Sequence, residues 1–204
     1  TVADANGCSV TVDVLIIQPT ELSAIVSQSD LTCFGSNDGE FEVLASGATP
    51  DYTYDIGSGP QASGSFTGLA AVAYTVNVLD ANGCATSIDV IIGEPTLVMA
   101  SILIQTDPLC FNGTEGEFTI EGSGGAPAYQ FDMGTGLQAS GMFTAQTAGT
   151  YSIDVIDANG CTDNISVTLS EPTELLGTID AQTGTSCSGV ADGTVDLSAS
   201  GATP

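Results

Sequence analysis

The chain has 204 residues, of which 25 are acidic and none is Lys, Arg or His, so its formal net charge is −25. Nucleic-acid binding is excluded because phosphate neutralisation needs Lys or Arg, and a His-dependent catalytic triad or His-ligated metal site cannot be built. Apolar residues make up 42% of the chain, yet no apolar run reaches the roughly 18 residues that span a membrane. With 25 Gly and 8 Pro, the composition is typical of a folded, turn-rich β protein without membrane insertion.

Short stretches in which apolar and polar residues alternate follow one another along the chain, and this period of two predicts β-strands. The first complete series lies at 22–26, 41–45, 52–56, around Phe66, 74–78 and 88–92. An equivalent series recurs at 118–120, 129–133, 151–155 and 165–169. Gly, Pro, Asn and Asp clusters separate the segments, and none has a sustained helical period.

The aromatic residues fall mainly on the apolar positions of these alternating segments. In the first series they are Phe41, Tyr52, Tyr54, Phe66 and Tyr74. This placement predicts core packing, since a sugar-stacking surface would require several of them to point outward together.

A five-residue motif shows that the chain is a tandem repeat. Asp-Ala-Asn-Gly-Cys occurs at 4–8, 80–84 and 157–161, with successive copies 76 and 77 residues apart. A second set of cysteines is spaced by 77 residues and consists of Cys33, Cys110 and Cys187. Six or seven short strands in each period predict an all-β chain of tandem immunoglobulin-like β-sandwich repeats of about 77 residues, arranged end to end.

The repeat boundaries divide the chain into four parts. We expect 1–20 to be the C-terminal part of a preceding repeat, 21–95 and 96–172 to be complete repeats 1 and 2, and 173–204 to be the N-terminal part of a following repeat. The chain is thus expected to come from a longer array, in which a missing signal peptide is no surprise.

The combined motifs resemble a known repeat family. The residues that match are Cys33, Gly35, Asp38 and Gly39, then Gly47, Pro50, Tyr52 and Tyr54, then Gly68, Leu69, Tyr74, Val76, Val78 and Asp80 to Cys84, and finally Pro95. This pattern resembles the SprB-type repeat of cell-surface adhesins of gliding Bacteroidota. Val72 departs from the Gly that the family often has there, whereas repeat 2 has Gly149. The resemblance implies export, a fibrous cell-surface location, an adhesive or gliding-motility role, and no catalytic residues.

The six cysteines, at two fixed places in each repeat, indicate disulfides in a secreted protein. Pairing within a repeat, ranked first, gives Cys33–Cys84 and Cys110–Cys161. Pairing of sequence neighbours gives Cys8–Cys33, Cys84–Cys110 and Cys161–Cys187. The first loop and last hairpin of an immunoglobulin-like sandwich lie at opposite poles, however, and a disulfide spans no more than about 7 Å between Cα atoms. A third pairing, Cys33–Cys161 between successive repeats, therefore stays open.

Two acidic sets recur, and their oxygen ligands suit Ca²⁺. The candidate ligands are Asp38, Glu40, Glu115, Glu117, Asp80 and Asp157. Neither set forms an EF-hand loop, and turn chemistry already accounts for the Asp-Ala-Asn-Gly sequence. The expected turn residues are Asn6, Gly7, Asn82, Gly83, Asn159 and Gly160. No cofactor is required, and calcium is kept as an alternative to plain solvation.

These patterns favour a non-enzymatic structural segment of an extracellular filament or adhesin stalk, in which neighbouring repeats contact one another. Its expected partners are those repeats and identical chains in a fibre. The competing hypothesis is an adhesive module that binds surface glycans, with or without Ca²⁺.

Overall fold

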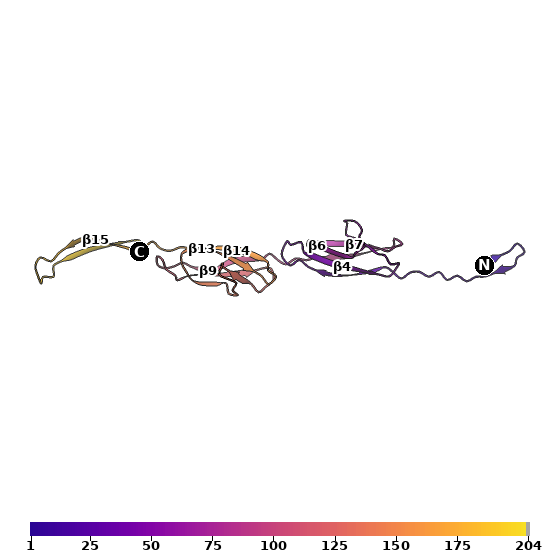
Figure 1. The fold of residues 1–204 in the computed structure, drawn as a ribbon, viewed down its shortest axis with the longest axis horizontal. Coiled ribbons are helices and arrows are strands. Elements are labelled where there is room, and N and C mark those ends of the chain that lie inside the picture. Colours follow the sequence, from indigo (N-terminus) through magenta and orange to yellow (C-terminus); the bar gives the residue numbers. More distant parts are fainter. Residues whose placement is uncertain (203–204) are drawn as a thin grey trace. The chain divides into compact units, whose positions relative to one another are not determined.

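The computed structural model describes residues 1–202, and within them it contains only β-strands, turns and loops (Figure 1). Thr203 and Pro204, the last residues of the expected partial repeat 173–204, lie outside the described residues. No helix that could cross a membrane occurs in the described part of the chain. The chain forms two compact units: unit 1 comprises Thr1–Leu31 and Gly35–Glu94, and unit 2 comprises Thr32–Phe34 and Pro95–Pro204.

Unit 1 contains a sandwich of two antiparallel three-stranded sheets. One sheet has the order β3 (Ser23–Ser29), β4 (Gly39–Ser46), β6 (Ser65–Leu69), and the other has the order β5 (Thr53–Asp55), β7 (Ala73–Leu79), β8 (Ala85–Ile91). Pairing of the first strand with the second and fourth, and of the third with the fifth and sixth, is the arrangement of immunoglobulin-like domains.

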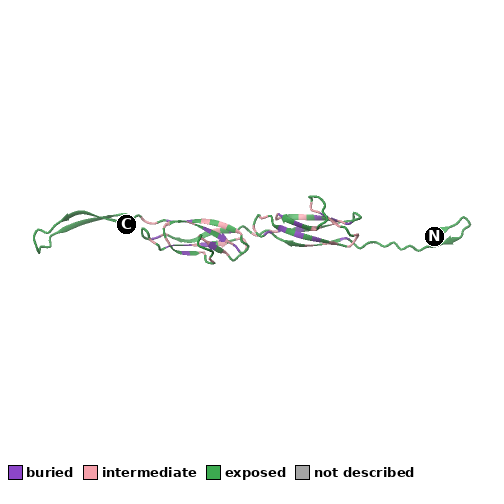
Figure 2. Ribbon diagram, in the orientation of Figure 1, coloured by how far each residue is buried: buried purple, intermediate pink, exposed green. Residues whose placement is uncertain are grey.

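Unit 2 repeats this arrangement. Its first sheet contains β9 (Met99–Thr106), β10 (Gly116–Ser123) and β12 (Met142–Gln146), and its second contains β11 (Gln130–Asp132), β13 (Gly149–Ile156) and β14 (Thr162–Leu169). The ends of the chain form two further hairpins. These are β1 (Val2–Ala3) with β2 (Ser9–Val10), and β15 (Leu176–Thr183) with β16 (Thr194–Ser200). The strand residues of both hairpins are exposed, as Figure 2 shows in green.

Alternation along the strands builds the two cores. Val76 and Val78 of β7 are fully buried, whereas Thr75 and Asn77 between them face solvent. The equivalent core positions of β13 hold Ile153 and Val155, both fully buried. Complete burial of such a side chain stabilises the fold by about 1.5–3 kcal/mol. With no cation to form ion pairs, the two apolar clusters carry this load, and the predicted all-β sandwich class is confirmed.

The aromatic residues pack as expected. Phe41, Tyr54 and Phe66 are buried in the unit 1 core, while Tyr74 is half-buried against it. The Tyr74 hydroxyl donates to the carbonyl oxygen of Ala70, four residues upstream, at 3.2 Å. In unit 2, Tyr151 donates to Thr147 O at 2.8 Å. This is the tyrosine corner that ties the start of the fifth strand to the preceding turn in immunoglobulin-like sandwiches.

A close backbone approach explains why Gln-Ala-Ser-Gly recurs in both repeats. The Val43 N–H donates to Gly64 O at 2.9 Å, and a Cβ atom on Gly64 would lie 1.9 Å from Val43 O. Gly141 meets Ile120 in the same way in unit 2, also at 1.9 Å. Only glycine fits where one backbone lies this close to another.

Candidate functional site

The Asp-Ala-Asn-Gly-Cys motif folds as a turn between the last two strands of each sandwich. In unit 1, Asp80 Oδ1 accepts hydrogen bonds from the backbone N–H groups of Asn82 at 3.0 Å and Cys84 at 2.7 Å. Its other oxygen accepts from Thr49 N–H at 3.1 Å. Gly83 has a φ of +82°, a conformation that favours glycine. The carboxylate thus closes the turn and ties it to the neighbouring 46–50 loop.

The equivalent turn in unit 2 has almost the same geometry. Asp157 accepts from Asn159 N–H at 2.9 Å, Cys161 N–H at 2.8 Å and Ala126 N–H at 2.8 Å. The expected turn residues lie in these two turns and in the N-terminal copy at 4–8: Asn6, Gly7, Asn82, Gly83, Asn159 and Gly160.

Backbone donors control the charge state of these two carboxylates. Burial raises the pKa of the Asp80 carboxyl, but hydrogen bonds from Cys84, Thr49 and Asn82 outweigh burial and hold its pKa below the usual value. The pKa of Asp157 is lowered in the same way, with Ala126 and Cys161 as the leading donors against burial. Both turns therefore stay ionised and closed at neutral pH.

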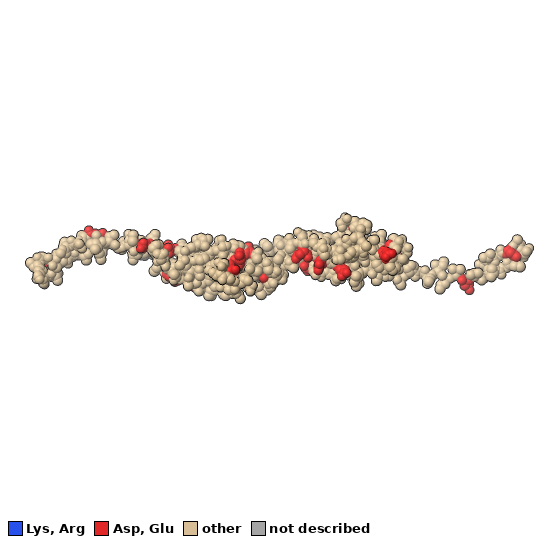
Figure 3. All heavy atoms as spheres, viewed as in Figure 1, with Lys and Arg blue, Asp and Glu red and all other residues tan. Residues whose placement is uncertain are grey.

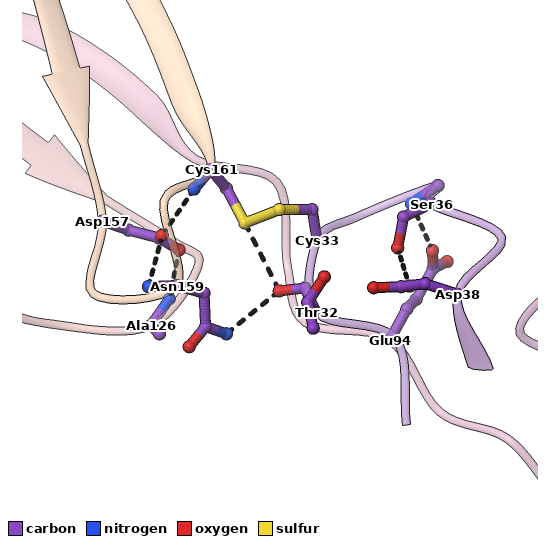
Figure 4. Close-up of a disulfide and its surroundings, with 10 residues drawn as sticks. Thr32, Cys33, Ser36, Asp38, Glu94, Ala126, Asp157, Asn159 and Cys161 are labelled. Carbon is purple, nitrogen blue, oxygen red and sulfur yellow. Dashed lines mark hydrogen bonds between the residues drawn. A yellow bond between two sulfur atoms is a disulfide. The ribbon is translucent and has the colours of Figure 1, made fainter. Parts of the chain in front are cut away.

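Unit 2 contains a disulfide between Cys33 and Cys161, whose Cα atoms lie 5.7 Å apart (Figure 4). Cys33 comes from the segment Thr32–Phe34, which follows β3 in sequence but is part of unit 2. The Asn159 Nδ2–H donates to Thr32 O at 3.0 Å, and Cys161 Sγ lies 3.3 Å from the same oxygen. The segment is thus held by one covalent bond and one hydrogen bond, both from the turn.

This pairing differs from the one ranked first, Cys33–Cys84 with Cys110–Cys161. It also differs from the sequence-neighbour pairs Cys8–Cys33, Cys84–Cys110 and Cys161–Cys187, because Cys33 and Cys161 are bonded to each other and the remaining cysteines are unpaired and exposed: Cys8, Cys84, Cys110 and Cys187.

Strand length is the reason that Cys33 and Cys84 do not meet. Leu31 N–H donates to Gly93 O just after the end of β8, whereas Cys84 lies just before its start. The seven residues of β8 separate them by roughly 23 Å at 3.3 Å per residue, far beyond the span of a disulfide. The geometric alternative, Cys33–Cys161, is the bond that the structure contains.

Carboxylates also shape the loops that carry Cys33 and Cys110. Glu94 Oε2 accepts from Gly35 N–H at 2.7 Å, and Glu171 Oε2 accepts from Asn112 N–H at 2.6 Å. Asp107 accepts from Ser170, and these hydrogen bonds lower the pKa of its carboxyl. Sequence reasoning missed Asp107 and its counterpart Asp30, although their spacing of one repeat was a visible signal.

The structure scatters the proposed calcium ligands. Asp80 and Asp157 lie in the turns, where backbone N–H groups bind their oxygens. Asp38 bonds to Ser36 (Figure 4), and Glu115 accepts from Leu109 N–H at 2.9 Å, while Glu40 and Glu117 are exposed on β4 and β10. In residues 1–202, no group of three or more acidic or Cys side chains is placed to hold a metal ion. Calcium binding therefore stays a prediction.

Two antiparallel sheets, a tyrosine corner and a recurring cysteine turn define an immunoglobulin-like tandem-repeat protein. The SprB repeat family model matches residues 25–60 and 102–137, which occupy the same positions in repeats 1 and 2. The expected resemblance is confirmed, and the chain carries two SprB-type repeats.

Three solved structures are similar to the chain over most of its length. The three N-terminal domains of the bacteriophage RB49 outer capsid protein Hoc match with 14% identity and a TM-score of 0.42, covering 91% of this chain and 70% of that one. A C-terminal intimin fragment, solved with the intimin-binding domain of its translocated receptor, matches with 16% identity and a TM-score of 0.41, covering 79% and 67%. Fibronectin(III)-like modules of Clostridium thermocellum CbhA match with 13% identity and a TM-score of 0.31, covering 72% and 95%. No curated protein sequence matches the chain.

Proposed function

We propose that the chain is a structural segment of a long extracellular or cell-surface filament or adhesin stalk built from disulfide-stabilised tandem repeats. The observation that carries this proposal is the composition of unit 2, which incorporates Thr32–Phe34 of the preceding repeat and binds it through Cys33–Cys161. A protein whose folded units share covalently bound segments is suited to bearing load along a chain of repeats. A disulfide also fits an oxidising location outside the cytoplasm.

The surface supports a passive, extended role. Acidic side chains are scattered over the face shown in Figure 3, and no Lys or Arg accompanies them. Dense charge of one sign makes such molecules repel one another and keeps them soluble. Trypsin-like proteases cut after Lys or Arg and have no site in this sequence.

We further propose that the segment is not an enzyme. The most strongly held acidic side chains, Asp80 and Asp157, are engaged by backbone N–H groups inside turns. Their lowered pKa keeps them ionised, whereas a general acid near neutral pH needs a raised pKa.

The competing hypothesis of a glycan-binding module has one observation in its favour. Phe34 and Phe111 have exposed rings, at 53% and 42% of their surface, and each follows a loop cysteine. The strand aromatics Phe41, Phe66, Phe118 and Phe143 are buried instead and form ring contacts within the cores. Two separate rings give a smaller stacking surface than the several adjacent aromatics that the module hypothesis requires.

Electron microscopy of the native protein on intact cells, located by gold-labelled antibody against this segment, tests the proposal. We expect labelled threads outside the cell. A glycan array probed with the 204-residue chain should show no selective binding. Label confined to the cell interior would overturn the stalk proposal, and a selective glycan removed by Phe34→Ala with Phe111→Ala would favour the module.

A further inference from the structure

Unit 2 has a groove beside a second loop cysteine that the Cys33–Cys161 disulfide does not use. Cys110 is exposed and unpaired in the loop between β9 and β10. The groove beside it is largely apolar, and its lining includes Leu109, Cys110, Phe111, Pro172, Leu175 and Ala202. Three of these side chains are strongly exposed for apolar residues, since Leu109, Phe111 and Leu175 have 75%, 42% and 64% of their surfaces accessible.

The repeat itself shows what such a loop binds. A shift of one 77-residue period places Leu109, Cys110 and Phe111 on Thr32, Cys33 and Phe34. In that earlier copy, the cysteine is bonded to Cys161 of an Asp-Ala-Asn-Gly-Cys turn, and Asn159 of the same turn donates to Thr32 O. The hydrogen bond uses a backbone carbonyl, so replacing Thr32 with Leu109 does not remove the acceptor.

The matching turn is also present and unused. Asp80 to Cys84 has the same hydrogen bonds as the bonded turn in unit 2, with the Asp80 oxygen 3.0 and 2.7 Å from the N atoms of Asn82 and Cys84. Cys84 is exposed and unpaired. Asn82 Nδ2 donates to Thr49 Oγ1 at 2.7 Å, which leaves the second proton of its amide for another acceptor.

We propose that the loop Leu109–Phe111 is a docking site for the turn Asp80–Cys84 of a second copy of this chain, joined to it by a Cys110–Cys84 disulfide. The inference deepens the proposed function and rests on it, because the same loop-to-turn bond continues the covalent linkage from one repeat to the next. Asn82 of the docked turn donates to Leu109 O, as Asn159 does to Thr32 O.

Bond formation needs an oxidant, which a small-molecule disulfide supplies. The thiolate of Cys110 attacks this disulfide, forms a mixed disulfide and releases one small thiolate. The thiolate of Cys84 then attacks the mixed disulfide at the Cys110 sulfur, forms the Cys84–Cys110 bond and releases the second small thiolate. Two protein thiols are oxidised, one small disulfide is reduced to two thiols, and the two protein protons are taken up by the released thiolates.

The test uses the full chain carrying Cys8→Ser and Cys187→Ser, which leaves Cys84 and Cys110 as the two free thiols. The protein is incubated with oxidised glutathione at moderate salt, so that repulsion between the acidic chains is screened. Glu-C digestion and non-reducing mass spectrometry then count the linked peptides. Random collision gives Cys84–Cys110 links in half of the pairs, with Cys84–Cys84 and Cys110–Cys110 sharing the rest.

We expect Cys84–Cys110 links to exceed the two symmetric links together by at least about tenfold. A statistical ratio, an excess of symmetric links or no intermolecular link at all would overturn the inference. None of these outcomes bears on whether native protein forms threads outside the cell, so the proposed function stands or falls separately.

A matched pair of variants tests recognition by the turn. Asn82→Ala removes the amide donor and should bring the link ratio toward the statistical value. Thr49→Ala removes the partner of Asn82 within the repeat and reproduces Ala126 of repeat 2, so heterotypic linkage should persist. Circular dichroism and melting of each variant show that the fold is intact. Equal ratios in both variants would contradict docking through the turn.

Discussion

Asp80 and Asp157 are the buried acidic residues of the described chain, and each is stabilised by backbone N–H groups rather than by a cation. The motif Asp-x-Asn-Gly-Cys is thus a device for building a turn: its first residue accepts hydrogen bonds, its glycine takes the left-handed conformation, and its last residue presents a thiol. A protein without Lys, Arg or His has few other ways to satisfy a buried carboxylate.

Asp80→Asn and Asp157→Asn should each lower the melting temperature of the affected unit by several degrees at neutral pH. The neutral amide keeps one acceptor oxygen but replaces the other with an NH₂ group that cannot accept a hydrogen bond. Glu42→Gln removes the same charge from an exposed position on β4 and serves as the control. Equal melting temperatures for Asp80→Asn and Glu42→Gln would show that the turn carboxylate is unimportant.

The pH dependence of this difference follows from the lowered pKa values. The folded state binds the Asp80 and Asp157 protons at lower pH than the unfolded state, whose aspartate pKa is about 3.9. The stabilisation is therefore fully present above that value and is lost as pH falls through the folded pKa. Melting curves should show the gap between the native chain and Asp80→Asn narrowing below about pH 4. A gap that widens with acid would contradict the assigned direction.

Gly64→Ala should destabilise unit 1 by about 1–3 kcal/mol, because the added methyl would meet Val43 O and the strand would have to move. Urea unfolding followed by tyrosine fluorescence measures the loss. Gly184→Ala is the control, since a Cβ there would meet nothing within 4 Å. Similar effects from both substitutions would indicate a general cost of removing glycine rather than this close contact.

At the scale of strands, period-two alternation located most of the sandwich from sequence. The segments at 41–45 and 74–78 became β4 and β7 with the expected residues inside. Register was beyond such reasoning: β4 is displaced against β6 between Gly39 and Phe41, and a bulge depends on contacts between strands distant in sequence. The short β6 was visible only as Phe66, because its five residues carry too little alternation.

Ile153→Ala should lower the free energy of unfolding of unit 2 by about 2–5 kcal/mol, since the side chain is fully buried in β13 and leaves a cavity. Ile153→Val restores the residue that repeat 1 has at this position, Val76, and should cost only about 0.5–1.5 kcal/mol. The exposed Thr144→Ala on β12 is the control. Urea titration should show the unit 2 transition moving alone, and a shift of both transitions would mean that the units unfold together.

At the scale of the whole chain, the cysteine pairing could be narrowed from sequence but not decided. Repeat spacing separated loop cysteines from turn cysteines, and strand length argued against joining them within one sandwich. The deciding fact was that Thr32–Phe34 belongs to unit 2, which follows from packing between residues about 128 positions apart. No local pattern encodes such a contact, so the correct pair appeared only among the alternatives.

Salt and calcium should act on the chain in the same way. The charge of −25 repels itself, and any dissolved cation screens it, so the melting temperature should rise with ionic strength. Because the turn carboxylates already accept backbone hydrogen bonds, we expect calcium to match magnesium at equal ionic strength and a chelator to have no effect. A rise specific to calcium and reversed by chelator would support the calcium alternative.

The Cys33–Cys161 bond also has a mechanical consequence. Tension applied to the two ends of the chain passes from Cys33 directly to Cys161, so the peptide between them, which includes the strands from β4 to β13, is bypassed. Reduction should release these 128 residue steps, adding roughly 430 Å of contour length at about 3.4 Å per residue. Single-molecule stretching with and without reductant would measure this hidden length, and the native chain should behave as a tether with a nearly fixed maximum extension.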